Sequence, residues 1–304
     1  MGISFWKHHP YSDQNGHLLA QEAIDFQNTF QFDFLKLTSA GDWLAVCYGA
    51  GDELWENDSL GRRKITSFPL QETRDFYHLK SFSFQEKMLV EILDALRICC
   101  ENVSVPVYVT IFCPLSQLIQ ISGIELFLKT AQKEPEAIHA ALAVIIQNTK
   151  KTIDAASKVG VGGLYFVTQH MQTEILSLET YQQFGRYSDE ICLIKASELF
   201  DSIIFHLHGN DCYACIAENI PKMSIHCAYS EVSTSNTQSI EKAGYPIIYG
   251  LAHHILSKAN SFQDCKEILD NFPTSSFLTC DCVLPLNFPN EKINLWTNFV
   301  RSLS

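Results

Sequence analysis

The stretch Ile203-Ile204-Phe205-His206-Leu207-His208-Gly209 joins an apolar strand pattern to two histidines and a turn residue. Residues two apart in a strand point to the same face, so both imidazoles face one side. Gly209 lets the backbone turn sharply directly after them. The segment therefore predicts a buried strand whose carboxyl end carries a pair of histidines.

Similar short apolar runs occur along the whole chain, each separated from the next by a helical pattern. The other runs lie at residues 32–38, 105–112, 163–167, 223–227, 246–249 and 276–278, with an eighth candidate at 3–6. The helical patterns lie at residues 17–30, 83–100, 135–158, 178–200, 213–218, 237–243, 262–271 and 290–304. Strands that are apolar throughout are covered on both faces, which is typical of a parallel sheet.

This alternation over 304 residues predicts an α/β fold of one domain, a (β/α)8 TIM barrel that spans residues 1–304. An open, doubly wound sheet is the alternative, but no GxGxxG motif follows any strand. Ser83-Phe84-Gln85-Glu86 predicts a capping box at the start of a helix. Residues 49–81 are rich in turns and charges, and we expect a long loop or hairpin there, over one face of the barrel.

Composition limits the classes of partner. The net charge of −12 disfavours nucleic acid, because phosphate binding needs clustered Lys and Arg. We expect the one dense basic run, Arg62-Arg63-Lys64, to be a solvated turn and not a phosphate site. The chain has 11 cysteines, an odd number, and neither a leading apolar segment nor an apolar run long enough for a membrane. A reducing cytoplasm is therefore the expected location.

Barrel enzymes carry their chemistry at the carboxyl ends of the strands. Cys280-Asp281-Cys282 follows the last predicted strand. A cysteine sulfur of this segment could reach the axis of the barrel, as could the imidazoles of His206 and His208. Two neutral imidazoles, one thiolate and an open position are typical of catalytic zinc, and a thiolate favours soft or borderline metals. The alternative is that the two histidines are ordinary hydrogen-bonded residues at a strand end.

Further polar residues end other strands or follow them: Lys36, Thr38, Gln117, His170, Gln172, His226 and Tyr249. His226 could be a fourth ligand, an acid–base group or a core histidine, and we favour a contact with substrate. Cys212-Tyr213-Ala214-Cys215 is a lone CxxC motif, and buried helix cysteines explain it better than a metal or redox site.

At these residues the chain resembles the uroporphyrinogen decarboxylase superfamily, which includes the cobalamin-dependent zinc methyltransferases. Phe34-Leu35-Lys36-Leu37-Thr38 resembles the first barrel strand, and Phe112 to Gln117 the loop after the second. Ile204 to Gly209 resembles the strand that reads H-x-C-G in the methyltransferases. Leu278 to Pro285 resembles the closing strand, whose loop supplies a Cys in the methyltransferases and a His in the decarboxylases.

The chain departs from the family pattern at the residues that bind the substrate of the decarboxylases. The paired arginines that hold the carboxylates of a porphyrinogen are replaced by Phe5-Trp6-Lys7-His8-His9-Pro10, and Lys36 or Thr38 stands where the decarboxylases have an Asp. Each lost charge-assisted hydrogen bond is worth roughly 1.5–3 kcal/mol. Uroporphyrinogen decarboxylation is therefore the alternative function. A tetrapyrrole- or corrinoid-binding protein without catalysis is a second alternative.

The resemblance favours methyl transfer to a small acceptor, with a corrinoid on a partner protein as the methyl donor. It implies a zinc site of His206, of His208 in place of the usual Cys, and of Cys282. His226 and His170 would be acid–base or substrate-contacting groups, and Lys36, Thr38, Gln117, Gln172 and Tyr249 would bind substrate. We expect a small-molecule or tetrapyrrole substrate, no nucleic-acid or membrane partner, and a monomer or homodimer.

Overall fold

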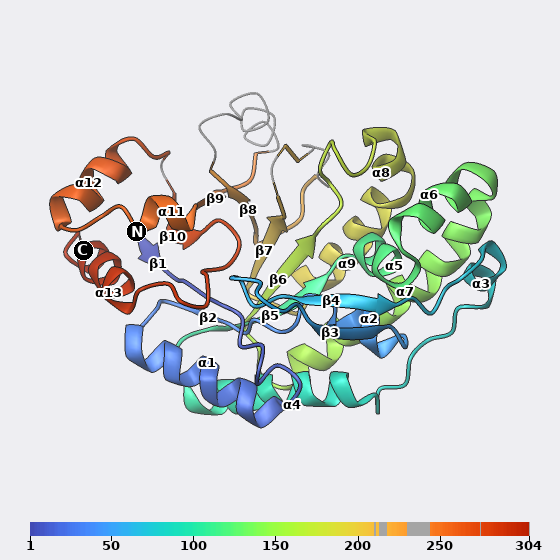
Figure 1. Ribbon diagram of the computed structural model, residues 1–304, viewed down its shortest axis with the longest axis horizontal. Coiled ribbons are helices and arrows are strands. Elements are labelled where there is room, and N and C mark those ends of the chain that lie inside the picture. Colours follow the sequence, from blue (N-terminus) through green and yellow to red (C-terminus); the bar gives the residue numbers. More distant parts are fainter. Residues whose placement is uncertain (210, 213–217, 230–243, 274, 304) are drawn as a thin grey trace.

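The computed structural model describes all residues except 210, 213–217, 230–243, 274 and 304. Within the described residues, eight parallel strands form one curled sheet (Figure 1). Their bounds are β1 Gly2–Ile3, β2 Leu35–Lys36, β5 Val107–Phe112, β6 Gly163–Thr168, β7 Ser202–Leu207, β8 Met223–Ala228, β9 Ile247–Leu251 and β10 Phe277–Cys280. The order β1-β10-β9-β8-β7-β6-β5-β2 follows the chain around a ring. The predicted (β/α)8 barrel is confirmed.

The ring meets at a short seam between β1 and β2. The Asp33 amide donates to the Ile3 carbonyl at 3.0 Å, and the Ser4 hydroxyl donates to the Phe34 carbonyl at 2.8 Å. The Asp33 carboxylate also accepts from the Ile3 amide at 2.6 Å. A side chain thus supplies part of the bonding that longer edge strands would supply with backbone groups.

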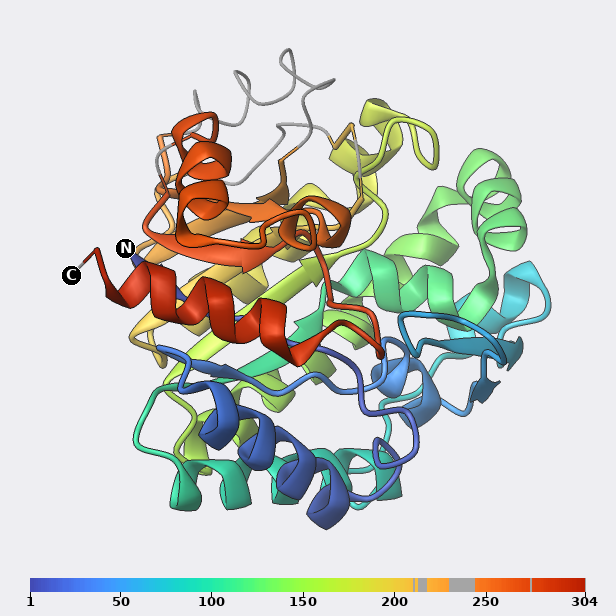
Figure 2. The same ribbon diagram turned by 60° about the vertical axis from the view of Figure 1, so that its left-hand side comes forward.

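Helices cover the outside of the barrel (Figure 2). The longer ones are α1 Gly16–Phe30, α4 Lys87–Asn102, α6 Ile124–Lys133, α7 Pro135–Lys158, α9 Arg186–Ser197 and α13 Asn290–Arg301. The shorter ones are α2 Trp43–Cys47, α3 Thr73–His78, α5 Pro114–Ser122, α8 Leu178–Phe184, α11 His253–Leu256 and α12 Phe262–Asp270. No described helix is long and apolar enough to cross a membrane.

Local chemistry sets several helix ends as the sequence indicates. The Asn15 side chain accepts from the Leu18 amide at 3.0 Å and caps α1. Pro135 occupies the first position of α7, where its missing N–H leaves no intrahelical bond unmade. Ser261 and Asp264 form a capping box at the start of α12.

Two helix predictions are wrong in detail. The Ser83 hydroxyl accepts from the Gln85 amide, and α4 begins only at Lys87, so Ser83 belongs to the preceding turn and caps nothing. The predicted helix over residues 178–200 is two helices that meet at Gly185, where a Cβ would lie 2.4 Å from the Tyr181 ring. The predicted helix over 237–243 lies outside the described residues, as does nearly all of the one over 213–218.

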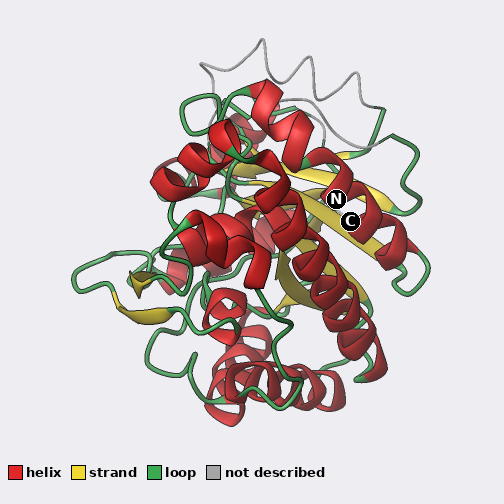
Figure 3. Cartoon of the chain, turned by 90° about the vertical axis from the view of Figure 1, so that its right-hand side faces the viewer, coloured by secondary structure: helices red, strands yellow, loops and turns green. Residues whose placement is uncertain are grey.

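The turn-rich segment forms an antiparallel hairpin, β3 Gly51–Leu54 and β4 Arg63–Ser67, which stands apart from the main sheet (Figure 3). The expected solvated turn at Arg62-Arg63-Lys64 is therefore wrong for Arg63. Its guanidinium is paired with Asp52 and with Asp13, and its side chain is only 12% exposed. The hairpin buries Arg63 because it folds back over the mouth of the barrel.

Candidate active site

A cavity of about 550 Å³ opens at the carboxyl ends of the strands, beneath the β3–β4 hairpin. Its floor is built from inward-facing strand residues: Thr110 and Phe112 of β5, Tyr165 and Val167 of β6, and His206 of β7. The alternation follows from the period of two along a strand, which sends the intervening residues outward to the helices. Polar groups from several strands thus meet in one enclosed space.

His206, His208 and Cys282 come together at this cavity, as the sequence predicts. One ligand atom of each residue can be chosen so that all three lie within 4.8 Å of one another. The Cys282 sulfur lies 3.4 Å from His208 Nδ1. Zinc lies at about 2.0–2.3 Å from nitrogen and sulfur ligands, so a shared ion would need separations of about 3.5 Å. The 3.4 Å between Cys282 and His208 already matches this value.

The hydrogen bonds of His226 favour one tautomer of His206. His226 Nε2 lies 3.1 Å from the Cys280 carbonyl, which can only accept, so that nitrogen carries the proton and Nδ1 is an acceptor. The Tyr165 hydroxyl at 2.7 Å and His206 Nδ1 at 2.8 Å both lie within hydrogen-bond distance of this acceptor, so His206 Nδ1 can donate to it. His206 Nε2 is then unprotonated, and it is buried without a hydrogen-bond partner among the described residues. Its lone pair is available to a metal.

Burial keeps these imidazoles neutral. Loss of solvation, and next the nearby His226, hold the pKa of His206 well below its ordinary value. Loss of solvation lowers the pKa of His226 to about 3, and it also lowers the pKa of His208. Neutral imidazole is the form that binds metal ions, so all of these rings are in ligand form at neutral pH.

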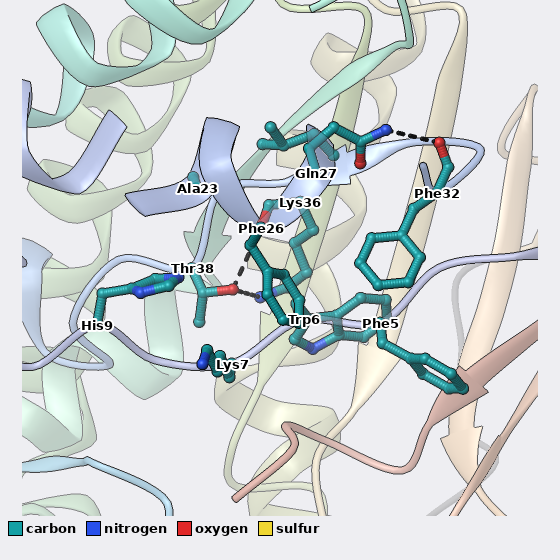
Figure 4. Close-up of a pocket in the computed structure, with 11 residues that line it drawn as sticks. Phe5, Trp6, Lys7, His9, Ala23, Phe26, Gln27, Phe32, Lys36 and Thr38 are labelled. Atoms are coloured by element: carbon teal, nitrogen blue, oxygen red, sulfur yellow. Dashed lines mark hydrogen bonds between the residues drawn. The ribbon is translucent and has the colours of Figure 1, made fainter. Parts of the chain in front are cut away.

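Lys36 places an ammonium group beside the three ligand residues. Its Nζ lies 4.6 Å from the centre of the Tyr165 ring. It also lies 5.3 Å from the centre of the Trp6 ring and 3.5 Å from the Thr38 hydroxyl (Figure 4). Burial lowers the pKa of Lys36 to about 8, and it raises the pKa of Cys282 to about 11. The ammonium opposes the rise at Cys282, since a positive charge favours the thiolate.

His170 presents a hydrogen-bond donor to the cavity. The Ser116 hydroxyl oxygen accepts from the Gln169 amide at 2.9 Å and from the Cys113 thiol at 3.1 Å. Its own proton is therefore free for His170 Nδ1, at 3.0 Å. His170 Nε2 then carries the N–H group. Loss of solvation, followed by His208, lowers the pKa of His170 to about 4, so the ring is neutral.

Four of the predicted site residues do not line the cavity. His226 is fully buried behind His206. The Gln117 amide nitrogen donates to the Phe112 carbonyl and to the Thr149 hydroxyl. The Gln172 amide donates to the His208 carbonyl at 2.6 Å, and so supports the histidine loop from behind. The Tyr249 ring packs against Tyr229 and Phe272. Lys36, Thr38 and His170 do line it.

Two of the cysteines that the sequence left open, Cys280 and Cys212, lie outside the group of three. The Cys280 thiol faces the Trp6 and Cys282 carbonyls and is not one of the three ligand residues. The Cys212 thiol donates to the His208 carbonyl at 3.3 Å. Cys215 lies outside the described residues.

Several cavity residues were not predicted from the sequence, namely His8, Asp42, Arg62 and Arg63. Loss of solvation lowers the pKa of His8 to about 3 and raises the pKa of Asp42 to about 7. Asp42 follows Gly41 in the loop after β2, and an acid in the loop after a barrel strand is the signal that could have indicated it. The two arginines belong to the hairpin, and nothing in the sequence shows where a hairpin docks.

The fold and cavity define the chain as a (β/α)8-barrel protein with a His/His/Cys group at the carboxyl ends of its strands. The model of the uroporphyrinogen decarboxylase (URO-D) family matches residues 8–302. The chain belongs to this family. A search of curated protein sequences gives no match.

Solved structures share the barrel at low sequence identity. A methyltransferase from Methanosarcina mazei is 14% identical, with a TM-score of 0.79 over 99% of this chain and 92% of that one. A B12-independent methionine synthase from Shewanella sp. W3-18-1, in complex with selenomethionine, is 11% identical, with a TM-score of 0.55 over 95% and 88%. At such identities the likeness shows the fold alone.

Proposed function

We propose that this protein is a zinc-dependent methyltransferase of the URO-D family, acting on a small acceptor, with His206, His208 and Cys282 as metal ligands. Two observations together carry the proposal. The three ligand atoms converge, and the buried His206 Nε2 has no hydrogen-bond partner among the described residues. A buried, unpaired acceptor is costly in a folded protein unless something binds it. The donor set of two imidazoles and one thiolate suits zinc.

When bound, zinc would supply Lewis-acid activation of an acceptor, with a thiol as the simplest case. His226 would act as a positioning residue, because the Cys280 carbonyl holds its Nε2 and its Nδ1 lies 2.8 Å from His206 Nδ1 as an acceptor. The Lys36 ammonium would offset negative charge on Cys282 or on the acceptor. The His170 N–H group would donate to an anionic part of the substrate.

The methyl carbon would leave its donor and bond to the acceptor atom, which loses its proton to solvent. A corrinoid on a partner protein is the proposed donor, and this part rests on the family resemblance alone. One neutral His in place of a thiolate removes a negative charge from the ligand set. The acceptor therefore need not be a thiol, since a more electrophilic metal also suits oxygen ligands.

Metal analysis tests the proposal. Protein purified without chelator should hold about one equivalent of zinc, and His206→Ala and Cys282→Ser should hold less than about a tenth. Cys280→Ser is the matched control and should keep the metal, because Cys280 lies two residues from Cys282 but outside the ligand group. Wild-type protein without zinc, or loss of zinc only in the Cys280 variant, would contradict the assignment.

The decarboxylase alternative is less well supported by the cavity. Arg62, Arg63 and Lys64 line it, but each is paired with a carboxylate of the protein, of Asp58, Asp52 and Glu53 respectively. Arg63 is thereby held within the protein, and the other two pairs would have to break before Arg62 or Lys64 could hold an acid group of a porphyrinogen. Incubation with uroporphyrinogen should yield no coproporphyrinogen. Tight binding of a corrinoid without any methyl transfer would instead favour the non-catalytic alternative.

A further inference from the structure

Asp42 is a buried carboxylate that the proposed chemistry does not use. It lies between β2 and α2, lines the same cavity as the three ligand residues, and is only 4% exposed. Both of its carboxylate oxygens are buried without a hydrogen-bond partner among the described residues. Buried carboxylates are almost always paired or hydrogen-bonded, so Asp42 calls for a partner that the described chain does not supply.

The charges around Asp42 indicate which kind of partner it is. Arg63 is the neighbouring cation, and it already serves two carboxylates, Asp52 through Nε and Asp13 through Nη1 at 3.4 Å. Asp42 is the third carboxylate near this single guanidinium, and no ion pair joins the two. Loss of solvation is the main cause of the raised pKa of Asp42; Asp52 and Asp13 add to it and Arg63 opposes it, which places these groups within electrostatic range of one another. When ionised, the three carboxylates outnumber the single guanidinium.

The other basic residues of the hairpin do not correct this excess. Arg62 pairs with Asp58 at 2.8 Å, and Lys64 pairs with Glu53 at 2.9 Å. Lys36 lines the cavity too, but its ammonium contacts the Tyr165 and Trp6 rings and the Thr38 hydroxyl. A neutral hydrogen-bond donor would satisfy the Asp42 oxygens but would leave the excess charge. A cation satisfies both requirements.

We propose that Asp42 binds a positively charged nitrogen of the substrate, so that the substrate of this cavity is a small ammonium compound. The inference deepens the proposed function by naming a feature of the substrate. It gives the cavity two recognition points, the ligand group at the ends of β7 and β10 and the carboxylate after β2. A substrate whose polar groups are all carboxylates would leave Asp42 unpaired.

Three four-carbon probes of matched size test the inference without a known substrate: n-butylammonium, butyrate and 1-butanol. Binding is measured by ligand-observed NMR titration at pH 8. Wild-type protein should bind n-butylammonium at least about tenfold more tightly than 1-butanol, and butyrate no better than 1-butanol. Asp42→Asn keeps the shape of the side chain and removes its charge. It should bind n-butylammonium and 1-butanol equally.

Asp58→Asn is the matched control, because it removes a carboxylate that pairs with the hairpin and does not line the cavity. It should keep the preference for n-butylammonium. No saturable binding of n-butylammonium by wild-type protein, or an unchanged preference in Asp42→Asn, would overturn the inference. The same titration on protein stripped of metal separates the two proposals. Asp42 should retain its preference there even if the zinc assignment fails.

Discussion

At the scale of single residues, the site depends on two buried groups whose bonding is incomplete. His206 Nε2 is an acceptor without a donor, and Asp42 has two acceptor oxygens without a donor among the described residues. Both line one cavity. Each unsatisfied buried polar group costs about 1–3 kcal/mol, so their presence together at the carboxyl ends of the strands points to ligands and not to chance.

Replacement of His226 by Leu tests whether it positions His206. The variant loses the acceptor beside His206 Nδ1, and zinc affinity should fall about 10–100-fold without being abolished. Competition with a chromogenic chelator measures this. Gln172→Ala removes a hydrogen bond to the His208 carbonyl but does not touch the imidazole rings of His206 and His208. It should therefore lower the zinc affinity by less. An unchanged affinity in His226→Leu would rule out the positioning role.

Replacement of Asp42 by Asn should stabilise the fold at high pH. Burial raises the folded-state pKa of Asp42 to about 7, well above its unfolded value near 3.9, so its ionisation destabilises the folded chain. The penalty is absent below about pH 4, grows between about pH 4 and 7, and is constant above that. Urea unfolding should show Asp42→Asn more stable than wild type by about 2–4 kcal/mol at pH 8 and equally stable at pH 4. Equal stability at both pH values would contradict the raised pKa.

At the scale of elements, the β3–β4 hairpin and the loop that carries Asp13 are joined by Arg63. Its guanidinium contacts Asp52 on β3 and Asp13 before α1, and the Asp13 and Asp52 side chains are 1% and 11% exposed. The hairpin pairs with no strand of the barrel sheet. The ion pairs of Arg63 with Asp52 and Asp13 are therefore among the contacts that hold the hairpin over the cavity.

Removal of Arg63 should loosen the hairpin. Arg63→Ala leaves two buried carboxylates without their cation, and the free energy of unfolding should fall by about 2–4 kcal/mol. Proteolysis should then cut first within residues 51–67. Lys64→Ala removes a pair with Glu53 in which both side chains are about half exposed, and the change should stay within about 0.5 kcal/mol. Equal effects of the two substitutions would show that burial of the Arg63 pair is unimportant.

At the scale of the whole molecule, the three ligand residues link distant parts of the ring. His206 and His208 lie at the end of β7, and Cys282 lies two residues beyond β10, with β8 and β9 between them. The β1–β2 seam beside β10 rests on few hydrogen bonds. A metal held by these ligands would clamp this half of the barrel.

Removal of zinc should therefore lower the thermal stability. A ligand at about 1,000 times its Kd stabilises a fold by about 4 kcal/mol, which corresponds to several degrees in Tm for a chain of this size. Calorimetry with and without EDTA measures the shift. His206→Ala should melt near the metal-free wild-type protein and should not respond to EDTA. A wild-type Tm that does not change with EDTA would contradict a metal clamp.

The sequence by itself determined the features that depend on local periodicity. Apolar runs such as residues 203–207 are strands because every residue is covered, and Pro135 starts a helix because its ring suits the first turn. The alternation of the two gave the barrel. The barrel in turn placed His206, His208 and Cys282 at the same end, since parallel strands of one ring share their carboxyl ends.

Only the tertiary structure decided which polar residues reach the cavity. Gln117 and Gln172 also follow strands, but their amides bond to backbone carbonyls, while Asp42 and Arg63 reach the cavity from a loop and from the hairpin. Side-chain direction beyond a strand end and the docking of a hairpin depend on contacts between segments far apart in the chain. Local periodicity carries no information about such contacts.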